Sequence, residues 1–201
     1  MRNIDYYLFT LSPFCYLAGE RLEAIARKHD VRISYRPFHL LKVFSETGTP
    51  LPKDRHPSRQ AYRFQELRRI ADMNGVPINL QPAHWPTDPL PSCHAIIVAG
   101  EVGGGNIGSL VHAILRACWA EEKDISEHDV LAECLEKNGF PESVLKEDMS
   151  KAAEAFERNT DDALERGVFG APSYLVDDQL FWGQDRLTYL DAWLDSRSGS
   201  W

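Results

Sequence analysis

The 201-residue chain lacks the features that mark several large classes of protein. Its 22 Lys and Arg residues are outnumbered by 30 Asp and Glu residues, and the net charge of −8 argues against a nucleic-acid or anionic-membrane surface, because both require a basic face. No apolar run approaches membrane-spanning length, and the N-terminus lacks the apolar core and small-residue cleavage site of a secretion signal. We therefore expect a soluble, cytoplasmic protein that binds neither nucleic acid nor a membrane.

Cysteine and catalytic motifs are also scarce. The four cysteines have no close spacing, which in a chain of this length favours a reducing compartment without structural disulfides. The seven histidines show no spacing typical of metal ligands, so no metal site is expected. The nucleophile elbow of hydrolases and the Walker A sequence are absent. These absences leave a small molecule or another protein as the expected partner.

One motif that is present suggests nucleotide binding, but its surroundings argue against it. Glycines at positions 103, 105 and 108 follow an apolar run in G-x-G-x-x-G spacing. A dinucleotide-binding unit needs a second parallel strand that ends near an acidic residue. After Asp124 the sequence instead predicts a helix start, with Ser126 and Asp129 as a capping box. We therefore interpret the glycines as a loop between two helices.

The segment Ser12-Pro13-Phe14-Cys15 carries the first strong positive signal. It follows an aromatic-rich strand predicted over 4–10, and its serine suits a helix N-cap while its proline suits the first helical position. A side chain at such a junction lies at the positive end of the helix dipole, beside free N–H groups. A bound thiolate would be stabilised there.

The second strong signal lies near the other end of the chain. Pro172 leads a short apolar run, the pair Asp177-Asp178 predicts a turn, and a second apolar run precedes the acidic start of a closing helix. This order predicts a hairpin led by a proline. If the Ala171–Pro172 bond is cis, the backbone N–H and C=O beside it can turn outward and pair with an extended, peptide-like ligand.

Between these signals the apolar spacing predicts mainly helices. We expect a continuous helix over 14–28, a strand over 31–35 parallel to the first, and a loop over 47–57. A helix over 58–74 follows, and we interpret its arginine-rich face as solvated surface. Residues 77–91 are predicted to be irregular, and further helices cover 107–119, a short stretch from 130 to 138, and 152–165.

The two signals together resemble the thioredoxin fold, in which the helix start lies beside a cis-proline. Further segments extend the resemblance in order along the chain: Tyr16-Leu17-Ala18, Arg36-Pro37, Thr47-Gly48, Gly75-Val76-Pro77, Gly167-Val168-Phe169-Gly170-Ala171-Pro172 and Phe181-Trp182-Gly183-Gln184-Asp185-Arg186-Leu187. The chain thus resembles the 2-hydroxychromene-2-carboxylate isomerase and kappa-class glutathione transferase family. This implies an α/β fold of the DsbA and kappa type, with a discontinuous thioredoxin-like domain over 1–45 and 167–201 and a large all-helical insertion over 46–166.

The resemblance also implies glutathione as cofactor, a small aromatic or electrophilic substrate, and a homodimer. Ser12 would be the catalytic residue, donating a hydrogen bond to the glutathione sulfur. The cofactor-binding residues implied are Ala171, Pro172, Gln184, Asp185, Arg186 and, from the loop, Lys53. Trp85 could line the substrate pocket, although an aromatic plug over the core fits the sequence equally well.

Three functions remain open from the sequence. The first is a glutathione-dependent isomerase of the 2-hydroxychromene-2-carboxylate type, or a kappa-like transferase with the same thiolate site. The second is a DsbA-like thiol-disulfide oxidoreductase, which would depend on Cys15 alone because Ser12 stands where redox members carry their first cysteine. The third is a module that binds a peptide or thiol without turnover. We expect Cys15 to be buried and unreactive.

Overall fold

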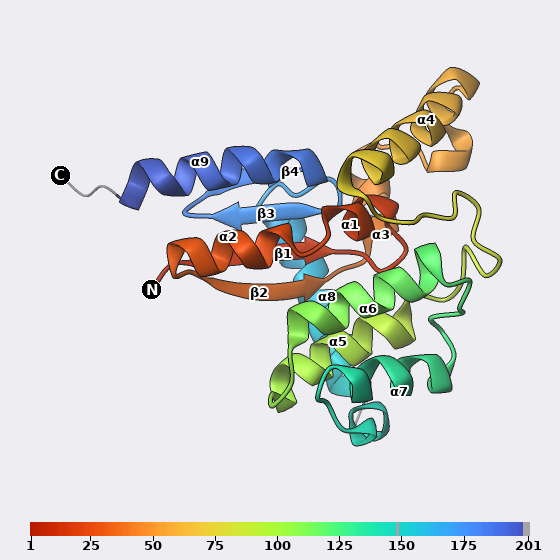
Figure 1. The fold of residues 1–201 in the computed structure, drawn as a ribbon, viewed down its shortest axis with the longest axis vertical. Helices are drawn as coiled ribbons and strands as arrows, with labels where there is room; N and C mark the ends of the chain where they lie inside the picture. The colour runs from red at the N-terminus through yellow and green to blue at the C-terminus, as the bar shows by residue number, and fades with distance from the viewer. Residues whose placement is uncertain (148, 199–201) are drawn as a thin grey trace.

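The computed structural model describes residues 1–147 and 149–198, and its centre is a four-stranded sheet (Figure 1). The strands β1 (Asn3–Leu8), β2 (Arg32–Pro37), β3 (Ser173–Val176) and β4 (Gln179–Trp182) lie in the order β2-β1-β3-β4. β1 and β2 are parallel, as predicted, whereas β3 is antiparallel to both β1 and β4. Strands from the two ends of the chain therefore pair in the middle of the predicted thioredoxin-like sheet.

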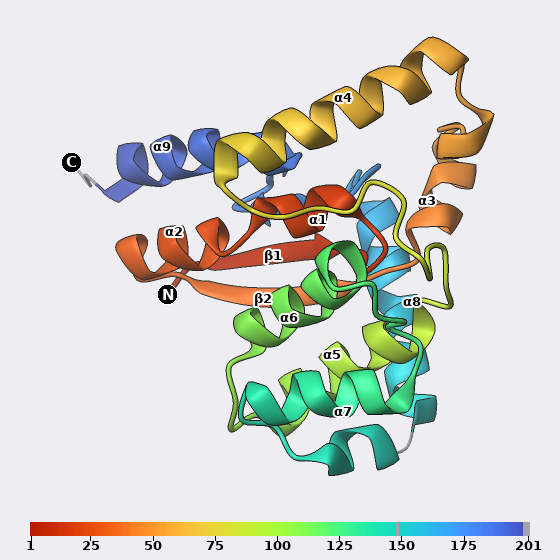
Figure 2. The ribbon, with the colours of Figure 1, turned by 45° about the vertical axis from the view of Figure 1, so that its right-hand side comes forward.

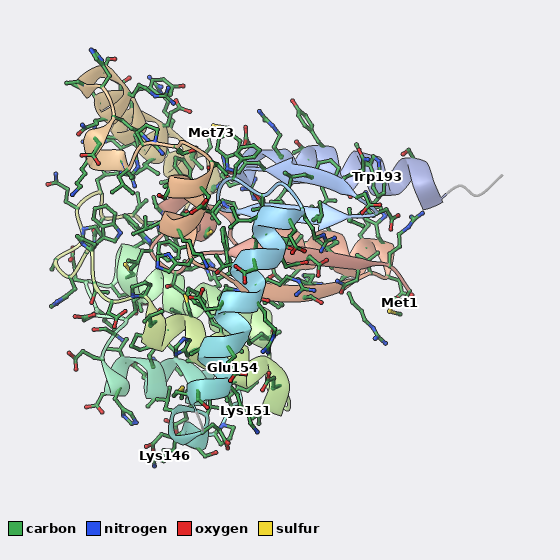
Figure 3. The ribbon with its side chains drawn as sticks, turned by 180° about the vertical axis from the view of Figure 1, so that it is seen from behind. Met1, Met73, Lys146, Lys151, Glu154 and Trp193 are labelled. Carbon is green, nitrogen blue, oxygen red and sulfur yellow. The ribbon has the colours of Figure 1, made fainter. Side chains whose placement is uncertain are left out.

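Helices make up most of the rest of the described chain. They are α1 (Pro13–Ala18), α2 (Arg21–His29), α3 (Leu40–Glu46), α4 (Pro57–Asn74), α5 (Leu90–Val102), α6 (Ile107–Ala120), α7 (His128–Lys137), α8 (Met149–Glu165) and α9 (Leu187–Ser198), with short 3-10 helices η1 (Pro52–Asp54), η2 (Glu142–Lys146) and η3 (Gln184–Arg186). α2 and α9 cover one face of the sheet and α8 crosses the other (Figures 1 and 3). α5, α6 and α7 form a group beside β2 (Figure 2), and the predicted helical insertion is confirmed.

The helix predicted over 14–28 is broken at Gly19, so that prediction is wrong. Gly19 has a φ of 58°, a conformation that glycine adopts without steric penalty. Beyond the break, Arg21 donates hydrogen bonds to the carbonyls of Ala18 and Leu17 at 2.9 and 3.1 Å. The Arg21 side chain thus bonds the two carbonyls that backbone N–H groups of a continuing helix would have bonded. α2 then starts in a new direction.

The glycine-rich segment forms the loop between α5 and α6, as predicted. A Cβ atom added to Gly105 would lie 2.5 Å from the Asn138 carbonyl and 2.6 Å from the Phe140 ring, so this glycine permits close packing against the end of α7. The capping box predicted at Ser126 is wrong, because α7 starts only at His128 and the Ser126 side chain bonds Asp124 instead. The apolar run before the glycines lies in α5 rather than in the strand that a nucleotide site would need.

A network of charged side chains joins β1 to α8. Asp5 is 7% exposed and accepts hydrogen bonds from Arg36 Nε and Arg166 Nη1, each at 2.7 Å. The Tyr7 hydroxyl, two residues along the same strand, donates a hydrogen bond to Asp162 of α8. Burial and that hydrogen bond both raise the pKa of Tyr7, which keeps the phenol neutral. The network fixes α8 and the segment after it against the sheet.

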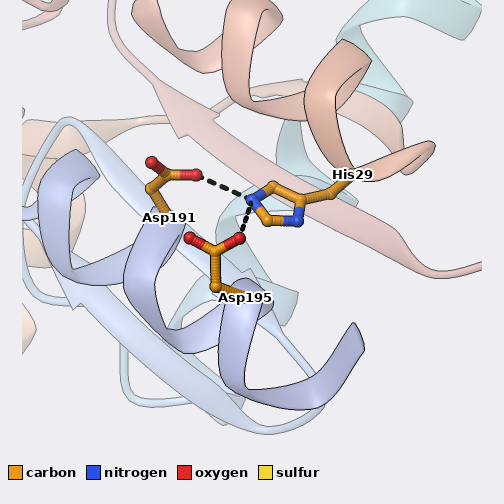
Figure 4. A group of neighbouring side chains, drawn as sticks. All are labelled: His29, Asp191 and Asp195. Atoms are coloured by element: carbon orange, nitrogen blue, oxygen red, sulfur yellow. Dashed lines mark hydrogen bonds and ion pairs between the residues drawn. The ribbon is translucent and has the colours of Figure 1, made fainter. Parts of the chain in front are cut away.

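A second cluster joins α2 to α9 on the opposite face (Figure 4). The buried His29 ring lies with Nε2 2.7 Å from an Asp191 oxygen and 3.9 Å from Asp195. The Lys28 ammonium bonds both carboxylates at 2.9 Å. Because the Lys28 ammonium already bonds both carboxylates, we interpret the cluster as a group of ion pairs that holds α9 against α2. None of the described helices has both the length and the apolar composition needed to cross a membrane.

Candidate functional site

Ser12 joins the two segments that the sequence singled out. It is the N-cap of α1, and its Oγ accepts a hydrogen bond from the backbone N–H of Cys15 at 3.3 Å. The same hydroxyl donates to the backbone carbonyl of Ala171 at 3.3 Å, across 159 residues of sequence. Pro13 occupies the first helical position, as predicted. The helix start and the proline loop therefore meet at one hydroxyl group.

The Ala171–Pro172 peptide bond is cis in the structure. The loop is held from both sides, because the Pro172 carbonyl accepts from the Gly183 N–H at 2.9 Å and the Gly170 carbonyl accepts from the Ser173 hydroxyl at 2.8 Å. A Cβ atom at Gly170 would lie 2.2 Å from the indole nitrogen of Trp182, so only glycine fits there. The Ala171 and Pro172 carbonyls thus both accept hydrogen bonds within the fold, the first from Ser12 and the second from Gly183, and the loop is fixed in place.

The three residues predicted at the closing helix lie in η3, directly before α9. Gln184 is buried, and its Oε1 accepts a hydrogen bond from Arg21 Nη2 at 2.5 Å. Asp185 and Arg186 lie at the surface and form an ion pair of 2.6 Å with each other. Gln184 thus has a partner within the fold, while the Asp185 carboxylate faces solvent. Arg21, which ties η3 to the end of α1, was not predicted, and its spacing in the sequence gives no signal for this contact.

Trp85 contacts the residue before Ser12, whereas Lys53 lies at the surface on η1. The Trp85 indole Nε1 donates to the carbonyl of Leu11, the residue before Ser12, at 3.2 Å. Its ring centroid is 5.6 Å from that of the fully buried Trp119, so the indole is anchored to the core. Lys53 is exposed on η1, and within residues 1–147 and 149–198 its ammonium forms no ion pair.

The α4 face that we interpreted as solvated includes one arginine that is only partly solvated. The guanidinium of Arg63 is partly buried, 5.9 Å from the centroid of the Phe64 ring and 5.8 Å from that of Trp85. Arg63 therefore points toward the site, and the interpretation is wrong for this residue. A signal existed in the sequence, since Arg63 precedes the fully buried Leu67 by four residues, and such residues share one face of a helix.

Cys15 is unsuited to act as a nucleophile. It is buried and unpaired, as are the other three cysteines of the chain. Burial raises the pKa of its thiol to about 11, against the opposing effect of hydrogen bonds from the backbone of Phe9 and from Ser12 and Tyr6. A thiol with this pKa is almost wholly protonated near neutral pH, and the thiolate is the reactive form.

Two hollows of the surface lie away from Ser12 and Pro172. One of about 490 Å³ is bordered by Glu23, Tyr35 and Ile107, and one of about 270 Å³ by His94 and Met149. Neither includes Ser12 or Pro172. We assign the site by the convergence of Ser12, the cis-proline loop and η3 rather than by size, because an extended ligand that pairs with a backbone edge needs no deep cavity.

Comparison with known proteins places this geometry in a family. The family model described as a DSBA-like thioredoxin domain matches residues 3–195. The 2-hydroxychromene-2-carboxylate isomerase of Sphingobium xenophagum is 31% identical over 96% of this chain and 98% of that protein. A solved structure of a 2-hydroxychromene-2-carboxylate isomerase has a TM-score of 0.79 at 27% identity and covers 98% of this chain and 96% of its own. Glutathione S-transferase kappa 2 of Caenorhabditis elegans is 25% identical over 92% of this chain and 88% of that protein. Because the family model matches residues 3–195, which include every strand of the sheet and the start of α1, the chain belongs to the DsbA-like thioredoxin family.

Proposed function

We propose that the protein is a glutathione-dependent isomerase of the 2-hydroxychromene-2-carboxylate type. The observation that carries the proposal is the Ser12 hydroxyl, held at the start of α1 beside the cis Ala171–Pro172 loop, in the place where a redox relative would have a thiol. Relatives named as isomerases and as a kappa-class glutathione transferase support an enzyme, and the isomerases match at the higher identities.

The residues at the site fit glutathione. The Ser12 hydroxyl can transfer its hydrogen bond from the Ala171 carbonyl to a sulfur placed beside it, and the freed carbonyl can then accept from a peptide N–H. The exposed Asp185 carboxylate can exchange Arg186 for an ammonium group, while Gln184 is fixed beside it by Arg21. When bound, glutathione supplies a thiol nucleophile that adds reversibly to a conjugated substrate.

Ser12 acts on the protonation state of that thiol. Its oxygen accepts from the Cys15 N–H, so its own proton remains available for donation. A hydrogen bond to the charged form of an acid favours that form, and Ser12 therefore lowers the pKa of a sulfur held beside it. A second contribution comes from the positive end of the α1 dipole, because Ser12 is the N-cap of that helix.

Calorimetric titration of reduced glutathione tests the proposal directly. We expect Asp185→Ala to weaken binding by about tenfold, because a charge-assisted hydrogen bond contributes roughly 1.5 kcal/mol. Glu154→Ala is the matched control, since Glu154 is also an exposed carboxylate beside an arginine but lies on α8, away from the site. Absence of binding by the wild-type protein at millimolar glutathione would refute the whole proposal.

A kappa-like transferase is the second candidate, supported by the similarity to the kappa-class protein. The two reactions share one site and differ in the fate of glutathione, which an isomerase returns and a transferase leaves attached to its substrate. Titration of free thiol after complete turnover of a chromene carboxylate separates them, since an isomerase leaves the thiol concentration unchanged. We further propose a homodimer in the cytoplasm, where four buried, unpaired cysteines would stay reduced.

The oxidoreductase alternative depends on Cys15 and makes an opposite prediction. We expect Cys15→Ala to leave glutathione-dependent turnover within about twofold of wild type, because the buried thiol contributes no thiolate. We also expect wild-type protein to show no reduction of insulin disulfides. Reduction of insulin by the wild type that is lost in Cys15→Ala would restore the oxidoreductase function.

A further inference from the structure

Two arginines near the site, Arg63 and Arg55, have no acidic partner among the described residues. Arg63 of α4 stacks on aromatic rings, as described above, and Arg55 lies 5.8 Å from the ring centroid of Phe44. The Arg55 Nε donates to the backbone carbonyl of Pro50 at 3.1 Å. In the part of the chain that the structure describes, neither guanidinium forms an ion pair with a carboxylate. This distinguishes them from Arg36 and Arg166, which share Asp5.

The environment of both arginines disfavours an unpaired charge. Both side chains are partly buried, and loss of hydration lowers the pKa of each guanidinium. Like charge adds to the effect, since the charge of Arg55 also lowers the pKa of Arg63 and the charge of Arg59 lowers that of Arg55. A partly buried cation without a partner is unfavourable, so an anion bound at this position would stabilise the arrangement. Guanidinium groups bind planar carboxylates through two parallel hydrogen bonds.

A short series of contacts connects Arg63 to Ser12. The guanidinium is 5.8 Å from the Trp85 ring centroid, and the Trp85 Nε1 is 3.2 Å from the carbonyl of Leu11. Leu11 immediately precedes Ser12. In Figure 1 the segment between α4 and α5, which contains Trp85, extends on the side of α1 away from β3. Apart from Ser12 itself and Lys53 of η1, the residues expected to bind glutathione belong to the loop before β3 and to η3.

We propose that Arg63, supported by Arg55, binds a carboxylate on the aromatic acceptor substrate while the acceptor ring lies against Trp85. The inference rests on the proposed function and adds to it the residues that would recognise the carboxylate of such a substrate and so select it over a neutral electrophile. We assign the carboxylate to the acceptor rather than to glutathione because Arg63 lies over the ring of Trp85, the side chain against which the acceptor ring would pack.

The test uses two dead-end ligands of the same shape, 2-naphthoate and 2-naphthamide, titrated calorimetrically into glutathione-saturated protein. We expect wild-type protein to bind the anion about tenfold more tightly than the amide. Arg63→Gln should weaken naphthoate about tenfold and leave naphthamide unchanged, and Arg63→Lys should recover part of the loss because it keeps the charge without the planar fork. Arg68→Gln, an exposed arginine of the same helix, is the control and should change neither affinity.

Each other outcome has a defined meaning. Equal affinities for naphthoate and naphthamide, or no binding of either, would overturn the inference while the glutathione titration still stood. A fall in glutathione affinity in Arg63→Gln, with the ratio of the two naphthyl ligands unchanged, would assign the carboxylate to glutathione and overturn the acceptor assignment. Failure of wild-type protein to bind glutathione at all would instead remove the proposed function itself.

Discussion

Replacement of Ser12 by alanine is expected to lower turnover by roughly 100-fold, the typical effect of losing one hydrogen-bond donor aimed at developing negative charge. The variant cannot donate to the glutathione sulfur, so the pKa of the bound thiol rises. The limb of the kcat/KM profile that depends on thiolate formation should therefore move to higher pH. Stopped assays across pH, with a chromene carboxylate as substrate, measure both effects.

The control for Ser12→Ala must separate catalysis from helix capping. Loss of an N-cap destabilises a protein by about 1 kcal/mol. Asn106 caps α6 in the same way, with its side-chain oxygen accepting from the Ser109 N–H at 3.1 Å. Asn106→Ala should therefore lose similar stability and keep full turnover. If Ser12→Ala stays within about threefold of wild type, the serine does not act on the thiol and the proposed role for its hydroxyl is wrong.

Asp5→Ala is expected to reduce the free energy of unfolding by about 3 kcal/mol, the largest stability effect we predict. The substitution leaves Arg36 and Arg166 partly buried beside β1 without the carboxylate that both share. When one partner of a buried ion pair is removed, the remaining charge keeps its desolvation penalty and has no attraction to offset it. The loss in stability is therefore far larger than the net stabilisation that the intact pair provides. Urea unfolding followed by circular dichroism measures the change.

An exposed ion pair on α8 provides the comparison. Glu157 lies 3.0 Å from Lys42, with both side chains largely in solvent, and Glu157→Ala should change stability by less than about 1 kcal/mol. If Asp5→Ala also costs less than about 1 kcal/mol, water already hydrates the two arginines, and they carry no desolvation penalty that Asp5 must offset.

Because Arg166 directly precedes the loop to Pro172, we also expect the Asp5 variant to bind glutathione less tightly under conditions where it is still folded.

The features that sequence alone could predict are those with local signals. The hairpin has a proline at its start and two aspartates at its turn, and the turn residues Asp177 and Asp178 do adopt positive φ values of 45° and 62°. Ser12 and Pro13 carry capping and first-turn preferences that are independent of the rest of the chain. The four-stranded sheet and its helical insertion followed from these signals together with the family resemblance.

The features that sequence missed depend on partners distant in the chain. The break at Gly19 is stabilised by Arg21, whose guanidinium also reaches Gln184, 163 residues away. The burial of Arg63 depends on Trp85, a residue in a segment without regular structure that sequence could not place. Helix spacing showed which residues share a face, but it could not show what would pack against that face. The family resemblance therefore predicted residues for a cofactor, whereas the contact of Arg63 with Trp85 was found only in the structure.

The central position of β1 also has a consequence for the synthesis of the protein. β1 pairs on one side with β2, which follows it closely, and on the other with β3, which begins only at Ser173. At ribosomal rates of about 5–20 residues per second, β3 is synthesised roughly 10–30 s after β1, and the edge of β1 that pairs with β3 stays unpaired for that time. An unpaired strand edge can join the edge of another chain. The pairing that brings Ala171 to Ser12 therefore forms only after the final hairpin has emerged, and until then an unpaired edge of β1 is open to association with other chains.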